Sequence, residues 1–123
     1  MRSDTTNIVI KRAEYQRLKV GKGALLKLID EAELSEAVYN SNAIENSTLT
    51  LSDTERVLLD LEVSKEYSLR EVFEAKNLAR VTEYIHKKGE ALPLSSESIL
   101  FLHNLLIGGI DDSIAGRFRK AGE

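Results

Sequence analysis

The chain has 123 residues, of which 42% are hydrophobic and 30% charged, with seven glycines and a single proline. This composition is typical of one globular domain with one core, and it excludes disordered and fibrous proteins. The formal net charge of −3 comes from 17 basic and 20 acidic residues interleaved along the chain, so no basic stripe indicates nucleic-acid binding.

Few residues interrupt helices, and no stretch of strand length alternates β-branched with polar side chains. We therefore expect an all-α fold, a small helical bundle. The absence of cysteine excludes disulfides and thiol chemistry, and two histidines are too few to make a zinc site without carboxylates, so we expect no metal. The N-terminus "MRSDTTNIVIKR" is too polar for a signal peptide, and the longest apolar run, "ILFLHNLLI", is far shorter than the roughly 20 residues that span a bilayer. These features predict a cytoplasmic protein with no membrane contact.

In chain order, residues 1–12 show no hydrophobic period and are predicted to form an extended or disordered lead-in. A weak helical pattern follows from Ala13 to Val20 and ends at the sequence "GKG", residues 21–23. A phosphate-binding P-loop would need four residues between its glycines and a Ser or Thr after the lysine, so this segment is interpreted as a turn.

Apolar residues then recur at helical spacing from Ala24 to about Ile29 and from about Leu34 to Glu45. At 100° per residue, the second segment places Ser41 and Glu45 nearly in line with Leu34 and Val38, on the side predicted to be buried. Because the negative end of the helix dipole disfavours an anion, the pattern alone indicates that Glu45 extends past the helix end to water.

Three more helices are predicted. A capping box, "SDTE", starts one at Ser52, and "SLRE" starts a longer one at Ser68 that ends at Lys88, where Gly89 is expected to provide a left-handed cap. The last helix follows Ser95 and Ser96. Its sequence "ESILFLHNLLI" is apolar almost all round, which predicts the central helix of the bundle.

His103 lies in the middle of this last helix. A metal ligand or a general base would need a second histidine, a cysteine or a carboxylate nearby, and none lies one turn away in the sequence. We therefore interpret His103 as a core histidine with its hydrogen bonds satisfied.

Four segments, in order, resemble Fic-family proteins. "SNAIEN", residues 41–46, fits the pattern [S/T]-x-x-x-E-[G/N] of the Fic inhibitory helix, and "TLTL" after it is similar to the usual continuation. "EVFEAKNLARVTEYI" resembles the family's long helix, "ILFLHNLL" its I-x-x-L-H-x-x-L helix, and "GRFR" the G-[KR]-[YF]-R before the flap. The resemblance covers roughly residues 34–119. It implies an N-terminal part of lead-in and short helices, 1–33, and an incomplete Fic-like core with its inhibitory helix, 34–123.

Fic proteins transfer AMP from ATP to a hydroxyl of a target protein, using Mg²⁺ and a loop of the form H-x-F-x-[DE]-G-N-G-R. His86 is followed by "KKGEAL" and His103 by "NLLIGG", so neither histidine opens such a loop. The resemblance therefore implies no catalytic residue and no cofactor in this chain, with ATP and Mg²⁺ belonging to a complete protein. It leaves open whether the protein is an enzyme, and it predicts that this chain alone is inactive.

By the same resemblance, Ser41, Glu45 and Asn46 match the regulatory motif. Glu45 would pair with the phosphate-binding arginine of the catalytic loop and hold ATP in a non-productive pose. Ser41 would steady the helix end by hydrogen bonding, and Asn46 would begin the turn that follows. The implied partners are the catalytic half of a Fic protein, on the same or a separate chain, and the protein that receives AMP.

Two other functions fit the sequence. A non-catalytic helical module could inhibit a partner in trans, as small antitoxins related to this helix do. A helix-turn-helix DNA-binding protein would use the short helix at 53–61 and the next one, but the acidic balance disfavours it. The wide apolar helix faces predict that the isolated chain pairs with itself or with a partner.

Overall fold

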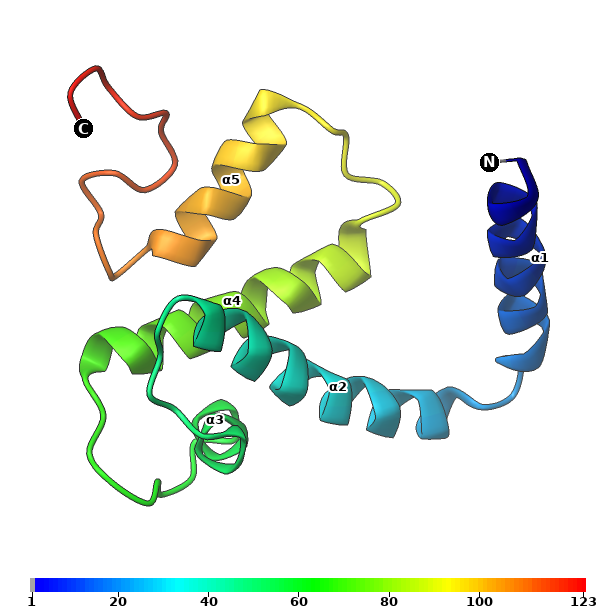
Figure 1. Ribbon diagram of the computed structural model, residues 1–123, viewed down its shortest axis with the longest axis horizontal. Helices are drawn as coiled ribbons and strands as arrows, with labels where there is room; N and C mark the ends of the chain where they lie inside the picture. The colour runs from blue at the N-terminus through cyan, green and yellow to red at the C-terminus, as the bar shows by residue number, and fades with distance from the viewer. Residues whose placement is uncertain (1) are drawn as a thin grey trace. The chain divides into compact units, whose positions relative to one another are not determined.

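The computed structural model describes the backbone of residues 2–123 and the side chains of residues 4–123. It contains five α-helices (Figure 1): α1 (Arg2–Leu18), α2 (Gly23–Ile44), α3 (Leu51–Leu58), α4 (Leu69–Lys88) and α5 (Ser96–Ile107). No strand occurs among the described residues. The prediction of an all-α protein is therefore confirmed.

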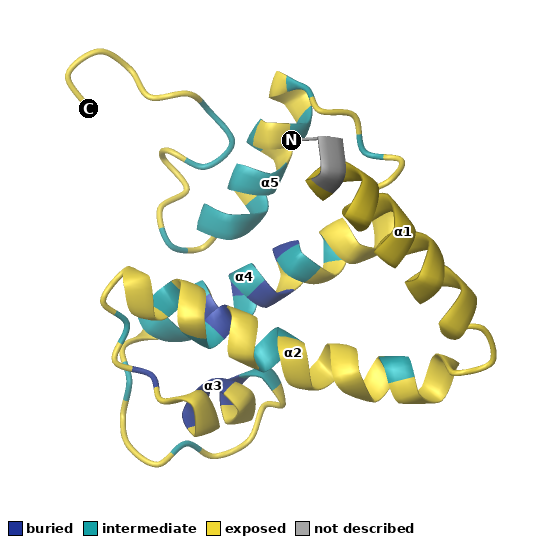
Figure 2. Cartoon of the chain, turned by 45° about the vertical axis from the view of Figure 1, so that its right-hand side comes forward, coloured by how far each residue is buried: buried dark blue, intermediate teal, exposed yellow. Residues whose placement is uncertain are grey.

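The chain divides into two compact units, residues 1–33 and residues 34–123. Helix α2 runs from the first unit into the second. The first unit holds α1 and the first three turns of α2, joined by a short turn in which Gly21 adopts a left-handed φ of +79°. Every side chain described in α1 is exposed (Figure 2).

Two expectations for the N-terminal part were wrong. The predicted lead-in is helix α1, and the two predicted segments at 24–29 and 34–45 are one continuous helix, α2. Neither helix contains proline, and the only glycine is the first residue of α2, so nothing interrupts the backbone hydrogen bonds. The first half of α1 shows no hydrophobic period, and that period was the signal on which the helix prediction depended.

The core of the second unit lies between the last turns of α2, α3 and α4. Its buried apolar residues are Val38, Leu49, Val57, Ala75 and Ala79, with Leu34, Leu58, Val63, Tyr67, Val72 and Leu78 packed against them. The small side chains of Ala75 and Ala79 lie one turn apart on α4 and allow close approach of the neighbouring elements. This core fixes the second half of α2 against α3 and α4.

Helix α3 begins at a different residue from the one predicted. Its N-cap is Thr50, whose side chain accepts a hydrogen bond from the Asp53 backbone N–H at 3.0 Å, and Ser52 lies inside the first turn. The predicted capping box is wrong, because Ser52 is already helical. The Asp53 carboxylate, in the same first turn, is turned inward and makes tertiary contacts.

Asp53 is the centre of a buried polar cluster. Its side chain is 1% exposed, and its Oδ1 accepts a hydrogen bond from the Ser64 N–H at 2.9 Å. Its Oδ2 accepts from the hydroxyls of Ser64 and Tyr67, both at 2.5 Å. These bonds tie the segment between α3 and α4 to α3. They also lower the pKa of Asp53 to about 2, with the Ser64 hydroxyl the largest cause, and raise the pKa of Tyr67.

This cluster predicts an acid-sensitive fold. The folded-state pKa of Asp53 lies below its unfolded value of 3.8, so the stabilisation is complete above about pH 4 and disappears as the pH falls through about 2. Asp53→Asn should lower the melting temperature by about 5 °C at pH 7. This difference should shrink as the pH falls from 4 to 2, measured by circular dichroism. Glu55→Gln, on the exposed side of α3, is the control. If the difference in melting temperature between Asp53→Asn and the unmodified chain stays constant from pH 4 to pH 2, the ionised Asp53 carboxylate does not stabilise the fold.

Helices α4 and α5 pack side by side. Ser68 caps α4 by accepting from the Glu71 N–H at 3.2 Å, and α4 ends at Lys88, both as predicted. Gly89 is right-handed, with φ −56° and ψ −38°, so the predicted left-handed cap is wrong; the Gly89 N–H simply extends the helical pattern to the Ile85 carbonyl. Ser95 caps α5, as predicted.

The contact between α4 and α5 has one buried polar member. Asn77, 2% exposed, donates its Nδ2 hydrogens to the carbonyls of Leu106 at 3.0 Å and Gly108 at 2.8 Å. Tyr84 and Phe101 also stack in a tilted arrangement, with ring centroids 5.1 Å apart. No residue of α5 is fully buried, so the prediction that α5 is the central helix is wrong. In this unit, α4 takes that position.

Candidate functional site

The end of α2 is closed by backbone hydrogen bonds. The Ser47 N–H donates to the Asn42 carbonyl at 3.0 Å, and the Asn46 N–H donates to the Ala43 carbonyl at 3.1 Å. Asn46 has a φ of +67°. This combination is a Schellman motif, in which the first residue beyond the helix is left-handed. Glu45 is therefore the C-cap residue, and its position is fixed by the backbone on both sides.

The side chains of Ser41 and Glu45 are both exposed. The exposure of Glu45 agrees with the interpretation that it extends past the helix end to water, whereas Ser41 was expected on the buried side. Val38 on the same line is fully buried, as predicted. At 1.5 Å per residue, Glu45 lies about 10 Å further along the helix than Val38, beyond the end of the core. Angular position alone cannot show how far a core extends along a helix axis. Within residues 4–123, no ion pair or side-chain hydrogen bond involves Glu45 or Ser41.

The left-handed conformation of Asn46 gives a direct test of this helix end. Asn and Gly tolerate a positive φ, but a β-branched side chain does not. We expect Asn46→Gly to leave the free energy of unfolding nearly unchanged and Asn46→Val to lower it by about 1–2 kcal/mol. Urea unfolding followed by circular dichroism measures both. Equal stability of the two variants would contradict the assigned cap.

The loop after α2 is held to the start of α4. The backbone N–H and the hydroxyl of Thr48 both donate to Glu71 Oε1 at 2.7 Å. The Ser68 hydroxyl donates to the other oxygen, Oε2, at 3.3 Å. These bonds, the Thr48 N–H first, lower the pKa of Glu71, because they favour its ionised form. Leu49, 4% exposed, then inserts into the core and fixes the loop from the other side.

Asn42 has the one buried side-chain nitrogen without a hydrogen-bond partner in the described part of the chain. It lies in the last turn of α2, next to Ser41, and the residue as a whole is half-buried. An unpaired buried amide costs about 1–3 kcal/mol. Asn42 is thus a polar group that an additional acceptor at this helix end would satisfy.

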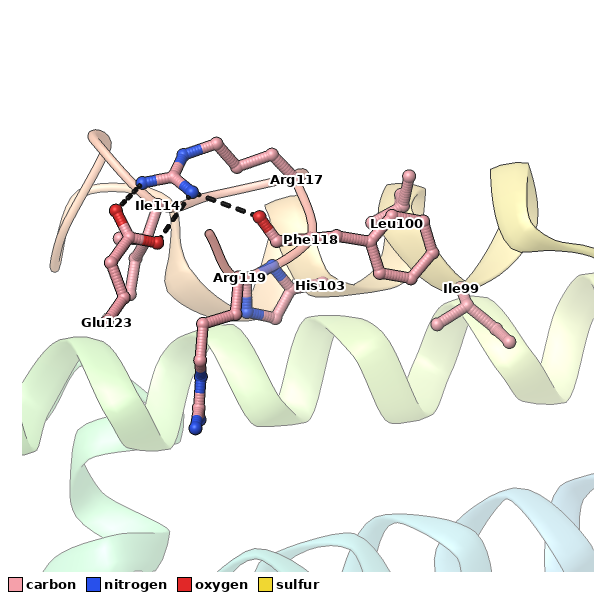
Figure 3. Close-up of a pocket in the computed structure, with 8 residues that line it drawn as sticks. All are labelled: Ile99, Leu100, His103, Ile114, Arg117, Phe118, Arg119 and Glu123. Atoms are coloured by element: carbon pink, nitrogen blue, oxygen red, sulfur yellow. Dashed lines mark hydrogen bonds and ion pairs between the residues drawn. The ribbon is translucent and has the colours of Figure 1, made fainter. Parts of the chain in front are cut away.

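A second feature is a pocket of about 600 Å³ between α5 and the C-terminal segment (Figure 3). Apolar side chains form one wall: Ile99, Leu100, Ile114 and Phe118. Arg117 forms a two-pronged ion pair with Glu123, with both N···O distances at 2.9 Å, and it also donates to the Ser113 and Phe118 carbonyls. This ion pair raises the pKa of Arg117 and lowers that of Glu123 to about 2. The Arg117 guanidinium is thereby occupied.

His103 also lines this pocket, and its surroundings do not form a catalytic site. Its Nδ1 accepts a hydrogen bond from the Gly116 N–H at 3.1 Å. This bond holds the left-handed Gly116, φ +72°, where a Cβ would come within 3.1 Å of the Asn104 side chain. His103 is half-buried, with a backbone partner rather than a carboxylate. It therefore anchors the C-terminal segment, in keeping with a satisfied histidine.

Among residues 4–123, no group of three or more His, Cys, Asp or Glu side chains could hold a metal ion. Two arginines line the pocket: Arg117, whose guanidinium is paired with Glu123, and Arg119, which is exposed. In Figure 3 the guanidinium of Arg119 points away from the Arg117–Glu123 pair. The pocket offers a surface for a small amphipathic ligand. Its lining residues do not include a nucleophile within hydrogen-bond distance of a general base.

Sequence reasoning missed three polar contacts that shape the site: Thr48 with Glu71, Asp53 with Ser64 and Tyr67, and Asn77 with the end of α5. Each joins residues 11 to 31 positions apart, and no local pattern pairs them. The predicted caps at Ser52 and Ser68 were the only cues near these residues. Hydrogen bonds between residues far apart in the chain produce no repeating pattern that a single sequence would show.

Comparison with known proteins adds no identification. No family model, curated protein or solved structure matches the chain significantly. In the described residues, each helix is too short or too polar to cross a bilayer.

Proposed function

We propose that this chain is the N-terminal regulatory part of a Fic-type protein adenylyltransferase, in which Glu45 blocks productive binding of the ATP γ-phosphate. The observation that carries the proposal is the presentation of Glu45. It is exposed and without an ion-pair partner in residues 4–123, at a helix end that the left-handed Asn46 fixes. A carboxylate held in this way is ready to meet a cation supplied from elsewhere.

Three contacts support this function physically. Val38 anchors the helix in the core, the Schellman motif sets the direction of the chain after Glu45, and the Thr48–Glu71 hydrogen bonds fix the loop beyond it. Pre-organisation of this kind reduces the entropy lost when the carboxylate pairs with a guanidinium. The position at the negative end of the helix dipole adds to the attraction for a cation.

In the proposed mechanism, Glu45 competes with the γ-phosphate for one arginine of the catalytic loop. The ion pair between them would be bidentate and partly desolvated, which makes it stronger than an exposed surface pair. ATP would then bind with its γ-phosphate displaced, and the α-phosphorus would not align with the target hydroxyl. AMP transfer would begin only when Glu45 leaves the arginine.

The simplest test concerns the chain by itself. Purified residues 1–123, incubated with α-labelled ATP and Mg²⁺, should transfer no label to themselves or to added proteins. The expected result follows from the absence of the H-x-F-x-[DE]-G-N-G-R loop. Label on the purified chain would mean that its function has been misassigned.

A second test asks where the catalytic loop lies. A continuation of the reading frame that contains the loop would place regulation in cis. A separate co-purifying chain that contains it would place regulation in trans, as in the antitoxin-like alternative. Recovery of partners without such a loop in either place would remove the Fic assignment altogether.

A further inference from the structure

We propose that the first unit, residues 1–33, is a homodimerisation element in which α1 of one copy packs on the start of α2 of the other. The inference goes beyond the proposed function and does not depend on it. It starts from α1, a helix of 17 residues whose side chains from Asp4 onward are all exposed. Isolated helices of this length are marginally stable in water and need packing.

Helix α1 carries an apolar stripe. Ile8, Tyr15 and Leu18 lie within one arc at 100° per residue, and Ile8 is 67% exposed. The amino group of Lys19 lies over the Tyr15 ring, 5.9 Å from its centroid, and Lys11 lies inside the same arc. The stripe is therefore apolar with two basic side chains, Lys11 within it and Lys19 at its edge. A complementary surface would be apolar with an acidic side chain beside it.

The start of α2 provides that surface. Leu25, Leu28 and Ile29 form an exposed apolar stripe with Ala32, and Leu28 is 64% exposed. Glu33 flanks this stripe. Residues 4–19 contain four basic and two acidic side chains, whereas residues 23–33 contain one basic and three acidic side chains. The two helices of the unit thus have matching apolar stripes and opposite charge.

The two stripes do not meet within one chain. The turn between the helices is closed by hydrogen bonds from the Lys22 N–H to the Lys19 carbonyl at 3.1 Å and from the Leu26 N–H to the Lys22 carbonyl at 3.0 Å. In Figures 1 and 2, α1 and the first turns of α2 diverge from this turn instead of packing side by side, and within residues 4–33 no contact between the two helices is found. The matching surface is therefore available from a second copy.

A second copy satisfies both stripes at once. In a two-fold dimer, α1 of each copy would cover the Leu25–Leu28 stripe of the other, so every contact would occur twice. A partner of a different sequence would need two apolar stripes at the same spacing, one with basic and one with acidic side chains beside it. A homodimer needs only the two stripes that each copy of the chain already has, one on α1 and one at the start of α2.

Sedimentation equilibrium of the full 123-residue chain tests the proposal. We expect a mass twice 13.8 kDa, with a dissociation constant that rises with salt because opposite charges border the stripes. Lys11→Glu combined with Lys19→Glu should raise that constant at least about tenfold. Adding Glu33→Lys to the same chain should restore part of the dimer. Leu94→Glu, at a 96% exposed site outside the first unit, is the matched control and should change nothing.

Zero-length cross-linking of the unmutated chain avoids any effect of substitution on folding. A mixture of ¹⁴N- and ¹⁵N-labelled chains, joined between Lys and Asp or Glu, should give mixed-isotope peptides that link residues 8–19 to residues 25–36. A monomeric mass at all concentrations, an unchanged dimer in the charge-reversed variant, or cross-links within single-isotope chains alone would each overturn the proposal. The last result would indicate an intramolecular hairpin.

Discussion

Replacing Glu45 by Gly in the protein that carries the catalytic loop should raise its self-labelling with AMP by roughly tenfold to a hundredfold. The proposed ion pair with the loop arginine is a charge-assisted contact, worth about 1.5–3 kcal/mol, and this difference sets the expected ratio of rates. The measurement is the initial rate of label incorporation from α-labelled ATP. Glu45→Gln, which keeps the shape and removes the charge, should give a large part of the increase.

The control for this experiment is Glu36→Gln. Glu36 is exposed on the same helix and loses the same charge, but it lies more than two turns before the helix end. We expect no change in the labelling rate of that variant. Equal rates for the Glu45 variants and the unmodified protein would remove the inhibitory role of Glu45, whatever family the chain belongs to.

Replacing Asn77 by Leu should destabilise the protein by about 2–3 kcal/mol, because the carbonyls of Leu106 and Gly108 would lose their donor in a buried contact. Leu is close to Asn in size, so the loss of hydrogen bonds is the main effect of the substitution. We also expect α5 and the segment after it to exchange amide hydrogens faster, since Asn77 is the buried polar link between α4 and α5. Urea unfolding and hydrogen exchange measure these effects.

Asn40→Leu is the matched control, because Asn40 is exposed near the end of α2, away from α5 in the sequence. This variant should change stability by no more than about 0.5 kcal/mol. Faster exchange confined to α5 in Asn77→Leu, with α3 unchanged, would match the local role assigned to Asn77. An Asn77 variant as stable as the unmodified chain would show that the Nδ2 hydrogen bonds add nothing to the packing of α5.

The sequence was a good guide wherever a local signal has one structural meaning. Ser68 and Ser95 were recognised as helix caps because a hydroxyl at that position accepts from an N–H three residues later, whatever surrounds it. Asn46 was likewise placed in the turn after the helix, and its left-handed φ agrees with that position. Val38 was correctly assigned to the buried side of α2.

The sequence failed where the answer depended on distant residues. Ser52 and Glu55 looked like a capping box, but Asp53 turned inward to Ser64 and Tyr67, and Thr50 became the cap. Ser41 was placed on the buried side because a helical wheel does not show how far the core extends along the helix axis. The first turns of α1 were missed because residues 1–12 show no hydrophobic period, whereas its last turns fall in the weak helical pattern that begins at Ala13.

By itself, then, the sequence determined the helical class, the cap positions with a fixed local geometry, and the motif that ends α2. Backbone hydrogen bonding and side-chain capping act over a few residues, so neighbouring residues in the sequence are enough to predict them. The tertiary structure alone decided that Ser41 is exposed, that Glu71 holds the loop after α2, and that α4 rather than α5 lies at the centre of its unit. Those outcomes depend on which surfaces meet after the chain has folded, and contacts between residues far apart in sequence set them.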